Sequence, residues 1–263
     1  MKKIIVQLLL LIVLFAGTWA ALSTIPFVRI FDLSEKVNID EETLGDMIWK
    51  TIEETETIVK DKALNDTLQY LKNNLCAANQ LPDDSIRLYV IENSDVNAFA
   101  LPNNRLVIYT GLIRKCKNAE ELSAVMAHEI AHLQKKHVMK KLVKEAGIAL
   151  IAAITGGSGS NEVIRQIIQM LSSSAYDRKL EEEADQTGVV YLCKSGIDPV
   201  HMANFFIRMS EKDDLPEVLD WISTHKDSKD RAAAILKQRK QLSCKNDFQF
   251  DAQRWAKVQD AVK

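Results

Sequence analysis

Five consecutive residues, His128-Glu129-Ile130-Ala131-His132, constrain the fold of this chain more than any other stretch. Side chains four residues apart lie on one face of an α-helix, so a helix here would aim both imidazoles at one point, where they can bind one zinc ion. The Glu129 carboxylate would then reach a water molecule beside that ion. Because the chain holds five histidines in 263 residues, chance would produce this pattern in on the order of one such chain in a hundred.

The sequence on both sides of the pentad predicts a helix, which the spacing of the two histidines requires. Asn118 with Glu121 three residues later predicts a capping box at a helix start. Apolar residues then recur at helical spacing through the pentad and beyond it. They are Leu122, Val125, Met126, Leu133, Leu142 and Val143. Two histidines inside a helix can also be ordinary hydrogen-bonded core residues, so the zinc interpretation needs a further ligand.

A zinc ion that takes part in chemistry needs a third protein ligand and an open position for water. About fifty residues later, Glu181 and Asp185 are spaced to share a helix face, and Gly188 continues that face with no side chain to keep a partner helix away. Glu181 could complete the zinc ligands while Asp185 accepts a hydrogen bond from the second nitrogen of a ligand histidine. A solvated acidic helix face is the alternative. Spacing alone leaves three residues open as the ligand: Glu181, Glu182 and Glu183.

These two segments resemble a known family. H-E-I-A-H followed by L-E-E-E-A-D-Q-T-G is similar to the H-E-x-x-H and E-x-x-A-D-x-x-G motifs of a gluzincin metallopeptidase family, family 48. That family includes CAAX-prenyl proteases, the mitochondrial overlapping-activity protease and bacterial envelope quality-control proteases. The resemblance runs from about residue 60 to about residue 240. It implies one Zn²⁺ per chain, with His128, His132 and Glu181 as its ligands, Glu129 as the general base and Asp185 as the residue that orients a ligand.

A β-hairpin is expected before the pentad. Residues 86–91 and 105–109 have the composition of strands, and Asn103-Asn104 can form a tight turn because asparagine tolerates positive φ. Residues 97–102, Asn-Ala-Phe-Ala-Leu-Pro, are similar to the edge strand of the same family. Such an edge could pair with an extended substrate backbone, although the hairpin could also serve the scaffold alone. The residues implied in substrate binding are Asn97, Ala98 and Phe99.

A third segment completes the resemblance. His225, preceded by a threonine and followed six residues later by Arg231, is similar to the family's T-H-P-x-x-x-x-R segment, with Lys226 in place of the proline. The resemblance implies that His225 faces the metal and that Arg231 orients it or supports the transition state. The alternatives are a surface loop residue and a solvated helix charge.

The remaining motifs indicate no further chemistry. His137 lies five residues beyond His132 and would point away from the zinc face of a continuous helix, so we expect no role for it or for His201. The glycine-rich residues 155–160 lack a P-loop lysine and follow no strand, which excludes a nucleotide site of that type. A net charge of −2 gives no electrostatic footprint for nucleic acid.

The N-terminal segment predicts a membrane location. Lys2 and Lys3 precede a nearly continuous apolar stretch from residue 4 to residue 27, which is long enough to span a bilayer. Residues 18–20 also form a passable signal-peptidase site, but the run continues past that site and exceeds the usual signal core, so we favour a retained anchor. The lysines keep the N-terminus cytoplasmic and send the rest outward. Secretion after cleavage is the alternative.

Four segments are expected along the chain. They are an anchor or signal segment at 1–28, a juxtamembrane helix region at 29–60 with an amphipathic helix over 41–60, a zinc metallopeptidase domain at 61–240, and a charged tail at 241–263. The expected fold class is α+β and predominantly helical, a gluzincin (zincin-like) domain with a small antiparallel sheet and an active-site edge strand. Four cysteines suit an oxidising compartment, and the sequence leaves their pairing open. They are Cys76, Cys116, Cys193 and Cys244.

The resemblance implies a zinc-dependent endopeptidase of the cell envelope. Its catalytic domain would lie on the periplasmic or outer face of the inner membrane, and its substrates would be membrane proteins or misfolded exported proteins in extended form. The alternative is a zinc-binding, chaperone-like or scaffold protein with a latent peptidase site. Glu129 favours the enzyme, because a structural zinc ion needs no general base.

Overall fold

The computed structural model describes residues 7, 40–82, 85–154, 160–211, 225 and 228–263. The chain divides into two compact units, Met1–Asn38 and Ile39–Lys263, and all the named elements belong to the second. The expected anchor at 1–28 therefore lies outside the described residues, apart from Gln7. Within the described ranges, no helix combines the length and hydropathy that crossing a bilayer requires.

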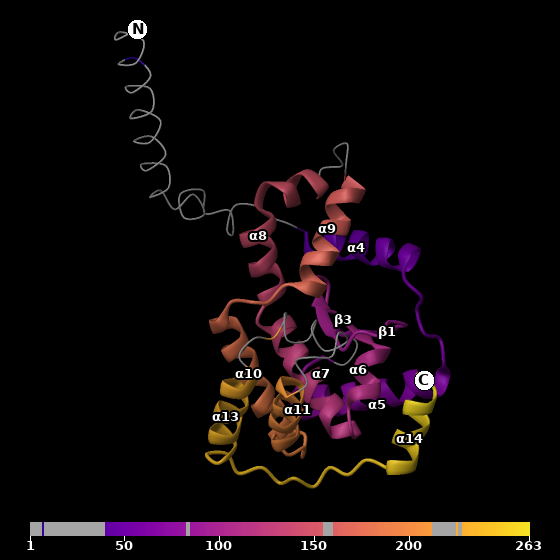
Figure 1. Cartoon of the computed structure of the whole chain (residues 1–263), viewed down its shortest axis with the longest axis vertical. Helices are drawn as coiled ribbons and strands as arrows, with labels where there is room; N and C mark the ends of the chain where they lie inside the picture. Colours follow the sequence, from indigo (N-terminus) through magenta and orange to yellow (C-terminus); the bar gives the residue numbers. More distant parts are fainter. Residues whose placement is uncertain (1–6, 8–39, 83–84, 155–159, 212–224, 226–227) are drawn as a thin grey trace. The chain divides into compact units, whose positions relative to one another are not determined.

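The second unit is mostly helical, with one small sheet (Figure 1). Its strands are β1 Arg87–Ile91, β2 Ala98–Leu101 and β3 Arg105–Tyr109. Its helices are α4 Glu41–Thr55, α5 Lys62–Ala78, α6 Thr110–Lys115, α7 Ala119–Gln134, α8 His137–Ile154, α9 Ser160–Ser173, α10 Arg178–Lys194, α11 Val200–Ser210, α13 Ser228–Arg239 and α14 Ala252–Asp260.

Helix α4 is amphipathic, as its sequence predicts, but it is shorter than expected. The Asp40 side chain accepts a hydrogen bond from the Glu42 backbone N–H and starts the helix. Leu44, Ile48 and Ile52 form its buried face. The helix ends at Thr55 rather than near residue 60, because the chain beyond it turns extended and Ile58 forms an antiparallel bridge with Ile91. A β-branched residue beside a sheet edge favours this extended pairing.

The sheet is mixed, with strand order β1-β3-β2. The expected turn forms, and Asn103 and Asn104 adopt the positive φ values of 61° and 51° that it requires. The strand that it joins to β3 in an antiparallel hairpin is β2, however, and not residues 86–91. Strand β1, however, pairs with β3 in parallel, so the expectation of a wholly antiparallel sheet is wrong for this pair. After β1, the chain passes to the far side of β3 and forms β2 there before it returns as β3. Strand β3 therefore lies in the centre of the sheet and is almost fully buried.

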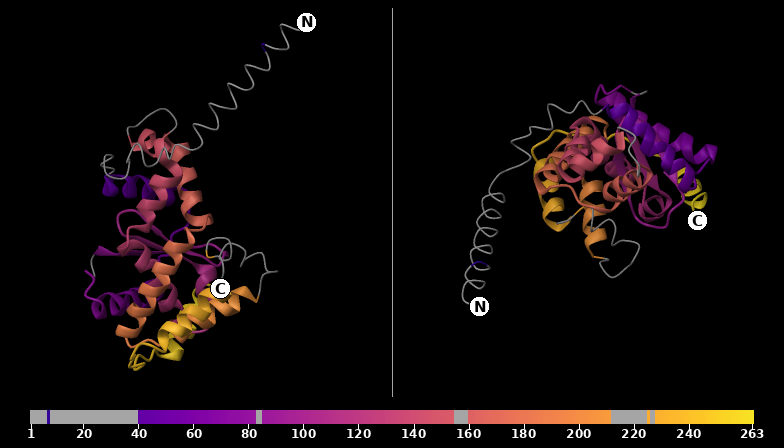
Figure 2. Two further views of the ribbon diagram at one scale, coloured as in Figure 1. Left: turned by 90° about the vertical axis from the view of Figure 1, so that its left-hand side faces the viewer. Right: turned by 90° about the horizontal axis from the view of Figure 1, so that it is seen from above.

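Helix α7 is the central element of the unit. Nearly all its residues are buried, including its whole stretch from Glu121 to Leu133. It packs against β2 and against α10. Figure 2 shows the unit from two further directions. Gly188 of α10 permits this close approach, because a Cβ atom there would lie 3.3 Å from the backbone nitrogen of His128.

Helix α7 ends at Gln134, so the apolar stripe that we expected to continue to Leu142 belongs to a second helix. Lys136 takes a positive φ of 57° between the two helices, and α8 begins at His137 in a new direction. The direction of His137 therefore cannot be deduced from helical periodicity counted from the pentad.

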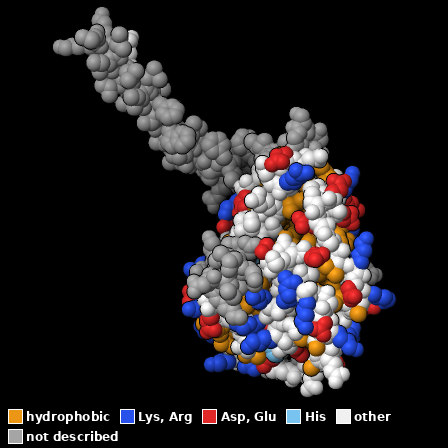
Figure 3. All heavy atoms as spheres, turned by 45° about the vertical axis from the view of Figure 1, so that its right-hand side comes forward, with side chains coloured by type: hydrophobic (Ala, Val, Ile, Leu, Met, Phe, Trp, Pro, Cys, Tyr) orange, Lys and Arg blue, Asp and Glu red, His pale blue; other side chains and the backbone are white. Residues whose placement is uncertain are grey.

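The C-terminal residues are part of the compact unit. A disulfide joins Cys193 at the end of α10 to Cys244, while Cys76 and Cys116 are buried thiols. Helix α14 buries Trp255 and packs against α5 and α6. On the face shown in Figure 3, positively and negatively charged side chains are interspersed.

Candidate metal centre

The two histidines of the pentad meet on one face of α7. The Asn118 side chain caps this helix by accepting a hydrogen bond from the Glu121 backbone N–H at 2.9 Å. One turn of helix separates His128 and His132, and both are fully buried. Their Nε2 atoms face each other at 3.1 Å. Burial lowers the pKa of His128 to about 3, so its imidazole is neutral at pH 7, the form that binds a metal.

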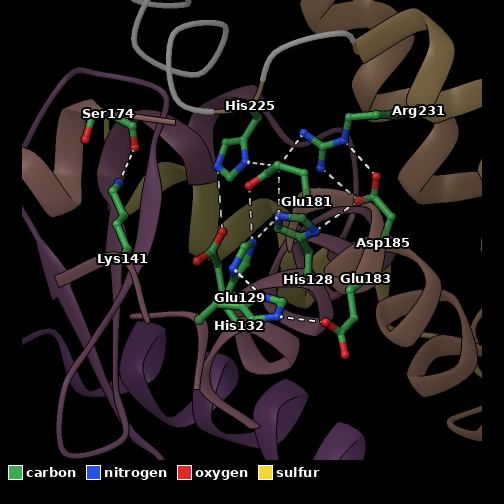
Figure 4. Close-up of polar contacts among 11 residues, drawn as sticks. His128, Glu129, His132, Lys141, Ser174, Glu181, Glu183, Asp185, His225 and Arg231 are labelled. Atoms are coloured by element: carbon green, nitrogen blue, oxygen red, sulfur yellow. Dashed lines mark hydrogen bonds and ion pairs between the residues drawn. The ribbon is translucent and has the colours of Figure 1, made fainter. Parts of the chain in front are cut away.

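Helix α10 supplies a carboxylate to the same point (Figure 4). Glu181 Oε2 lies 3.6 Å from His128 Nε2, and Glu181 Oε1 lies 3.4 Å from His132 Nε2. Glu182 is exposed and bonds to Gln186 on the outer face of the helix. Of the three consecutive glutamates that spacing left open, Glu181 is therefore the one that contacts both imidazoles.

Asp185 and Arg231 hold His128 and Glu181 through contacts on the side away from His132. Asp185 Oδ1 lies 3.0 Å from His128 Nδ1, the nitrogen that faces away from Glu181. Arg231 of α13 donates to both oxygens of Asp185, at 2.7 and 2.8 Å, and its Nη1 lies 2.6 Å from Glu181 Oε2. Burial alone would raise the pKa of Glu181, but the charges of His225 and Arg231 hold that pKa well below its usual value.

Glu129 lies next to the cluster formed by His128, His132 and Glu181 but does not contact the two imidazoles. Burial, and then the charge of Glu181, raise the pKa of Glu129 well above its usual value. Its carboxylate accepts a hydrogen bond from the backbone N–H of Ala100 and lies 3.7 Å from His225 Nε2. The side chain is thus attached to strand β2 and faces the region between the imidazoles and His225 (Figure 4).

His225 is 3% exposed and points into the cluster. Its Nδ1 lies 3.1 Å from Glu181 Oε2. One donor atom from each of His128, Glu181 and His225 lies within 4.8 Å of the others. Lys226, which stands in place of the family's proline, lies outside the described residues.

The expected substrate-binding strand lies beside Glu129 but is covered. Asn97, Ala98 and Phe99 are 1%, 2% and 5% exposed. The Asn97 side chain donates to the backbone oxygen of Ser172 at the end of α9. Because Asn97 bonds to Tyr109 across the hairpin, the alternation of an antiparallel ladder turns the backbone groups of Ala98 and Ala100 toward the open edge of β2.

Sequence analysis missed two neighbours of His132. The ring of Tyr176 stacks on the His132 ring, with centroids 4.0 Å apart. His137 is fully buried, and its Nδ1 lies 3.1 Å from His132 Nδ1. The expectation that His137 points away from the pentad histidines is therefore wrong. The sequence carried no signal for this contact, because the turn at Lys136 uses neither glycine nor asparagine for its positive φ.

The donor set fits a zinc ion. Tetrahedral zinc with bonds of about 2.0–2.1 Å to its ligands holds them roughly 3.3 Å apart, close to the separations of 3.1, 3.4 and 3.6 Å among His128, His132 and Glu181. Among the residues that the structure describes, Oε1 of Glu129 and Oε1 of Glu181 are buried without a hydrogen-bond partner. Glu181 and Asp185 are two buried carboxylates that contact the single positive charge of Arg231, and a buried excess of negative charge favours a bound cation.

A cleft of about 620 Å³ borders the cluster between α10 and α13. Glu181, Asp185 and Arg231 line it together with Tyr176. The cluster is thus buried without being remote from the surface.

Comparison with known proteins identifies similar sequences. The sequence model described as "Peptidase family M48" matches residues 62–239. The chain is 28% identical over 189 residues to a "Putative beta-barrel assembly-enhancing protease" of Vibrio cholerae, a match that covers 67% of this chain and 39% of that protein. It is 24% identical over 195 residues to the "Mitochondrial metalloendopeptidase OMA1" of Arabidopsis thaliana, covering 74% of this chain and 39% of the relative. The chain thus spans about two fifths of the length of these relatives.

Proposed function

Because the chain belongs to peptidase family M48, we propose that it is a zinc-dependent endopeptidase whose ion is held by His128, His132 and Glu181. The observation that carries the proposal is the convergence of these side chains beside Glu129, a buried carboxylate that is not in contact with the two imidazoles. A bound zinc ion would polarise the scissile carbonyl and acidify the attacking water. The other steps fall to residues of the chain.

Glu129 would act as the general base. It would take a proton from the attacking water and pass that proton to the leaving amine. The environment that raises its pKa makes the carboxylate a stronger base than an exposed glutamate, which suits proton transfer at neutral pH. Asp185 would hold His128 in one tautomer through the contact at Nδ1, and Arg231 would hold Asp185 in place.

Strand β2 would bind the substrate through its backbone. Ala98 and Ala100 turn their polar groups to the open edge of the sheet, and the N–H of Ala100 already contacts Glu129. A peptide that pairs with this edge would lie beside the general base. Because Asn97, Ala98 and Phe99 are buried, their side chains would read little of the substrate sequence, and the segment around Ser172 would have to move for the peptide to enter.

The substitution Glu129→Gln tests this proposal. The variant should keep its zinc, because Glu129 is not a ligand, and should lose nearly all peptide cleavage. Zinc content by elemental analysis and cleavage of an unfolded polypeptide, with and without chelator, measure the two properties on the same preparation. Substantial zinc loss from a normally folded variant would show that the base is misassigned.

We further propose a role in the cell envelope. The support is the name of the Vibrio cholerae relative, a protease described as enhancing β-barrel assembly, together with the apolar stretch at residues 4–27. The anchor at 1–28 would hold the metallopeptidase domain, 61–240, on the outer face of the inner membrane. Its substrates would be membrane or misfolded exported proteins. Fractionation of cells and protease protection of the intact chain test this location, and a domain on the cytoplasmic face would contradict it.

The alternative is a zinc-binding scaffold or chaperone-like protein with a latent site. Its support is the covered state of β2 and the inward position of His225. If the protein is a scaffold, wild type and Glu129→Gln should suppress the aggregation of an unfolded protein equally well, and neither should cleave it. Chelator-sensitive cleavage by wild type alone would exclude it.

A further inference from the structure

His137 connects a proposed zinc ligand to the protein surface. The residue is the first of α8 and is fully buried, and its two ring nitrogens contact two different side chains. Its Nδ1 lies 3.1 Å from His132 Nδ1, and its Nε2 lies 3.3 Å from Glu183 Oε2. Glu183 Oε1 in turn lies 3.1 Å from Lys135 Nζ. His132, His137, Glu183 and Lys135 thus form one row from the cluster outward; Figure 4 labels His132 and Glu183.

Hydrogen-bond polarity fixes every member of this row once His132 binds a metal. His132 faces the cluster with Nε2, so a ligand role uses the lone pair of that nitrogen and leaves the proton on Nδ1. His132 Nδ1–H must then donate to His137 Nδ1, which must carry a lone pair. The proton of a neutral His137 therefore resides on Nε2, where it donates to the Glu183 carboxylate. No donor meets a donor along the row.

The second ligand histidine has an equivalent support. His128 Nδ1 contacts Asp185, and Arg231 holds that carboxylate. On the His132 side, the corresponding contacts run from the His137 imidazole to the Glu183 carboxylate and then to the charged Lys135 side chain. His132 cannot reach a carboxylate directly on its Nδ1 side, because His137 occupies that position. The intervening ring therefore transmits to His132 the orientation that Asp185 gives His128.

We propose that His137 is a positioning residue that, backed by Glu183, fixes the tautomer and ring orientation of His132 for zinc binding. This inference rests on the zinc site proposed above. Residues in such positions next to metal ligands typically change metal affinity by about 10- to 100-fold when they are substituted. His137 would thus act on the ion through His132 without touching it.

The test measures zinc affinity of the full chain by competition with a chromophoric chelator. His137→Phe keeps an aromatic ring but removes both hydrogen bonds, and we expect zinc affinity to fall roughly 10- to 100-fold. His137→Gln retains one acceptor and one donor and should recover part of that loss. Glu183→Gln changes a side chain that is 42% exposed, so it should fold normally and weaken zinc binding by a smaller factor. Glu182→Gln, its exposed neighbour, is the matched control and should bind zinc as wild type does.

A second measurement does not depend on any variant. In ¹⁵N NMR spectra of the zinc-loaded wild-type chain, His132 should carry its proton on Nδ1 and His137 on Nε2.

The melting temperature of each zinc-free variant separates lost folding from lost affinity. Wild-type affinity in His137→Phe, or the opposite tautomer at His137, would overturn the inference while leaving the zinc site intact. A wild-type chain that binds no zinc would overturn the zinc site itself.

Discussion

The three consecutive glutamates at 181–183 share one chemistry and differ in where α10 aims them. Glu181 points at the two imidazoles, Glu182 at solvent, and Glu183 at His137 and Lys135. A helix rotates about 100° between neighbours, so the three consecutive side chains point in different directions and only one of them reaches the imidazoles. Residue identity therefore matters less here than position on the helix.

Substitution of these glutamates one at a time should separate their roles. Glu181→Ala should lower zinc occupancy far more than Glu182→Ala or Glu183→Ala, because it alone removes an atom from the donor set. Elemental analysis of the three purified variants measures the occupancy. If Glu182→Ala empties the site, the register assigned to α10 is wrong.

His225 is the residue whose role the structure sharpens most. One of its ring nitrogens belongs to the group of donor atoms formed with His128 and Glu181, and a fourth ligand on a zinc ion would exclude the attacking water. We expect His225→Ala to keep its zinc and to cleave faster than wild type, as the removal of a latch would. Much lower cleavage with unchanged zinc would instead indicate that His225 stabilises the transition state. Wild-type values for both properties would contradict both roles.

At the scale of elements, the site exists because α7 and α10 approach closely. The two helices bring the histidine pair and Glu181 together only if their backbones come within side-chain distance, and Gly188 provides that space. A Cβ atom at this position would lie 3.2 Å from Met202 Cε and 3.3 Å from the His128 backbone nitrogen. The flexible methionine can shift, whereas the helix backbone cannot.

Gly188→Ala should therefore weaken zinc binding. Overpacking costs roughly 1–3 kcal/mol, and the better helix propensity of alanine returns about 1 kcal/mol, so stability should change little or fall by up to about 2 kcal/mol. The larger effect should be on zinc affinity, because the added methyl group pushes α10 away from His128. Urea unfolding and chelator competition measure the two quantities, with the exposed Gln186→Ala of the same helix as control. Unchanged zinc affinity would show that the helix spacing is not critical.

At the scale of the whole unit, the C-terminal residues are covalently joined to the end of α10. The disulfide Cys193–Cys244 closes a loop with a sequence separation of 51 residues, and that loop contains α11 and α13. Helix α14 then returns the chain to α5 and α6. The segment that we expected to be a charged tail thus packs against the rest of the unit through α14 and the disulfide.

Reduction of this disulfide should destabilise the protein. Closure of a loop of this length stabilises a fold by about 4 kcal/mol in the chain-entropy description. A reductant should therefore lower the free energy of unfolding of wild type by up to that amount and should leave the double variant Cys193→Ser/Cys244→Ser unaffected. Urea titrations with and without reductant measure the difference. Equal stability of wild type under both conditions would show that the disulfide contributes little.

The sequence by itself determined what depends on local geometry. The spacing of His128 and His132, the cap at Asn118 and the turn at Asn103-Asn104 all follow from backbone periodicity and from φ preferences, which act over a few residues. These features need no knowledge of distant contacts. Family resemblance added the residues His225 and Arg231, which the structure brings to the same cluster.

Tertiary structure decided everything that depends on residues far apart in the chain. It selected the parallel partner of β1, the cysteines that pair, and the position of His137, which a turn with no sequence signal redirects toward His132. Such contacts are set by the packing of whole elements around one core, where many weak apolar interactions together choose the arrangement. No local pattern records that choice, and for this reason the support of His132 became visible only in the folded chain.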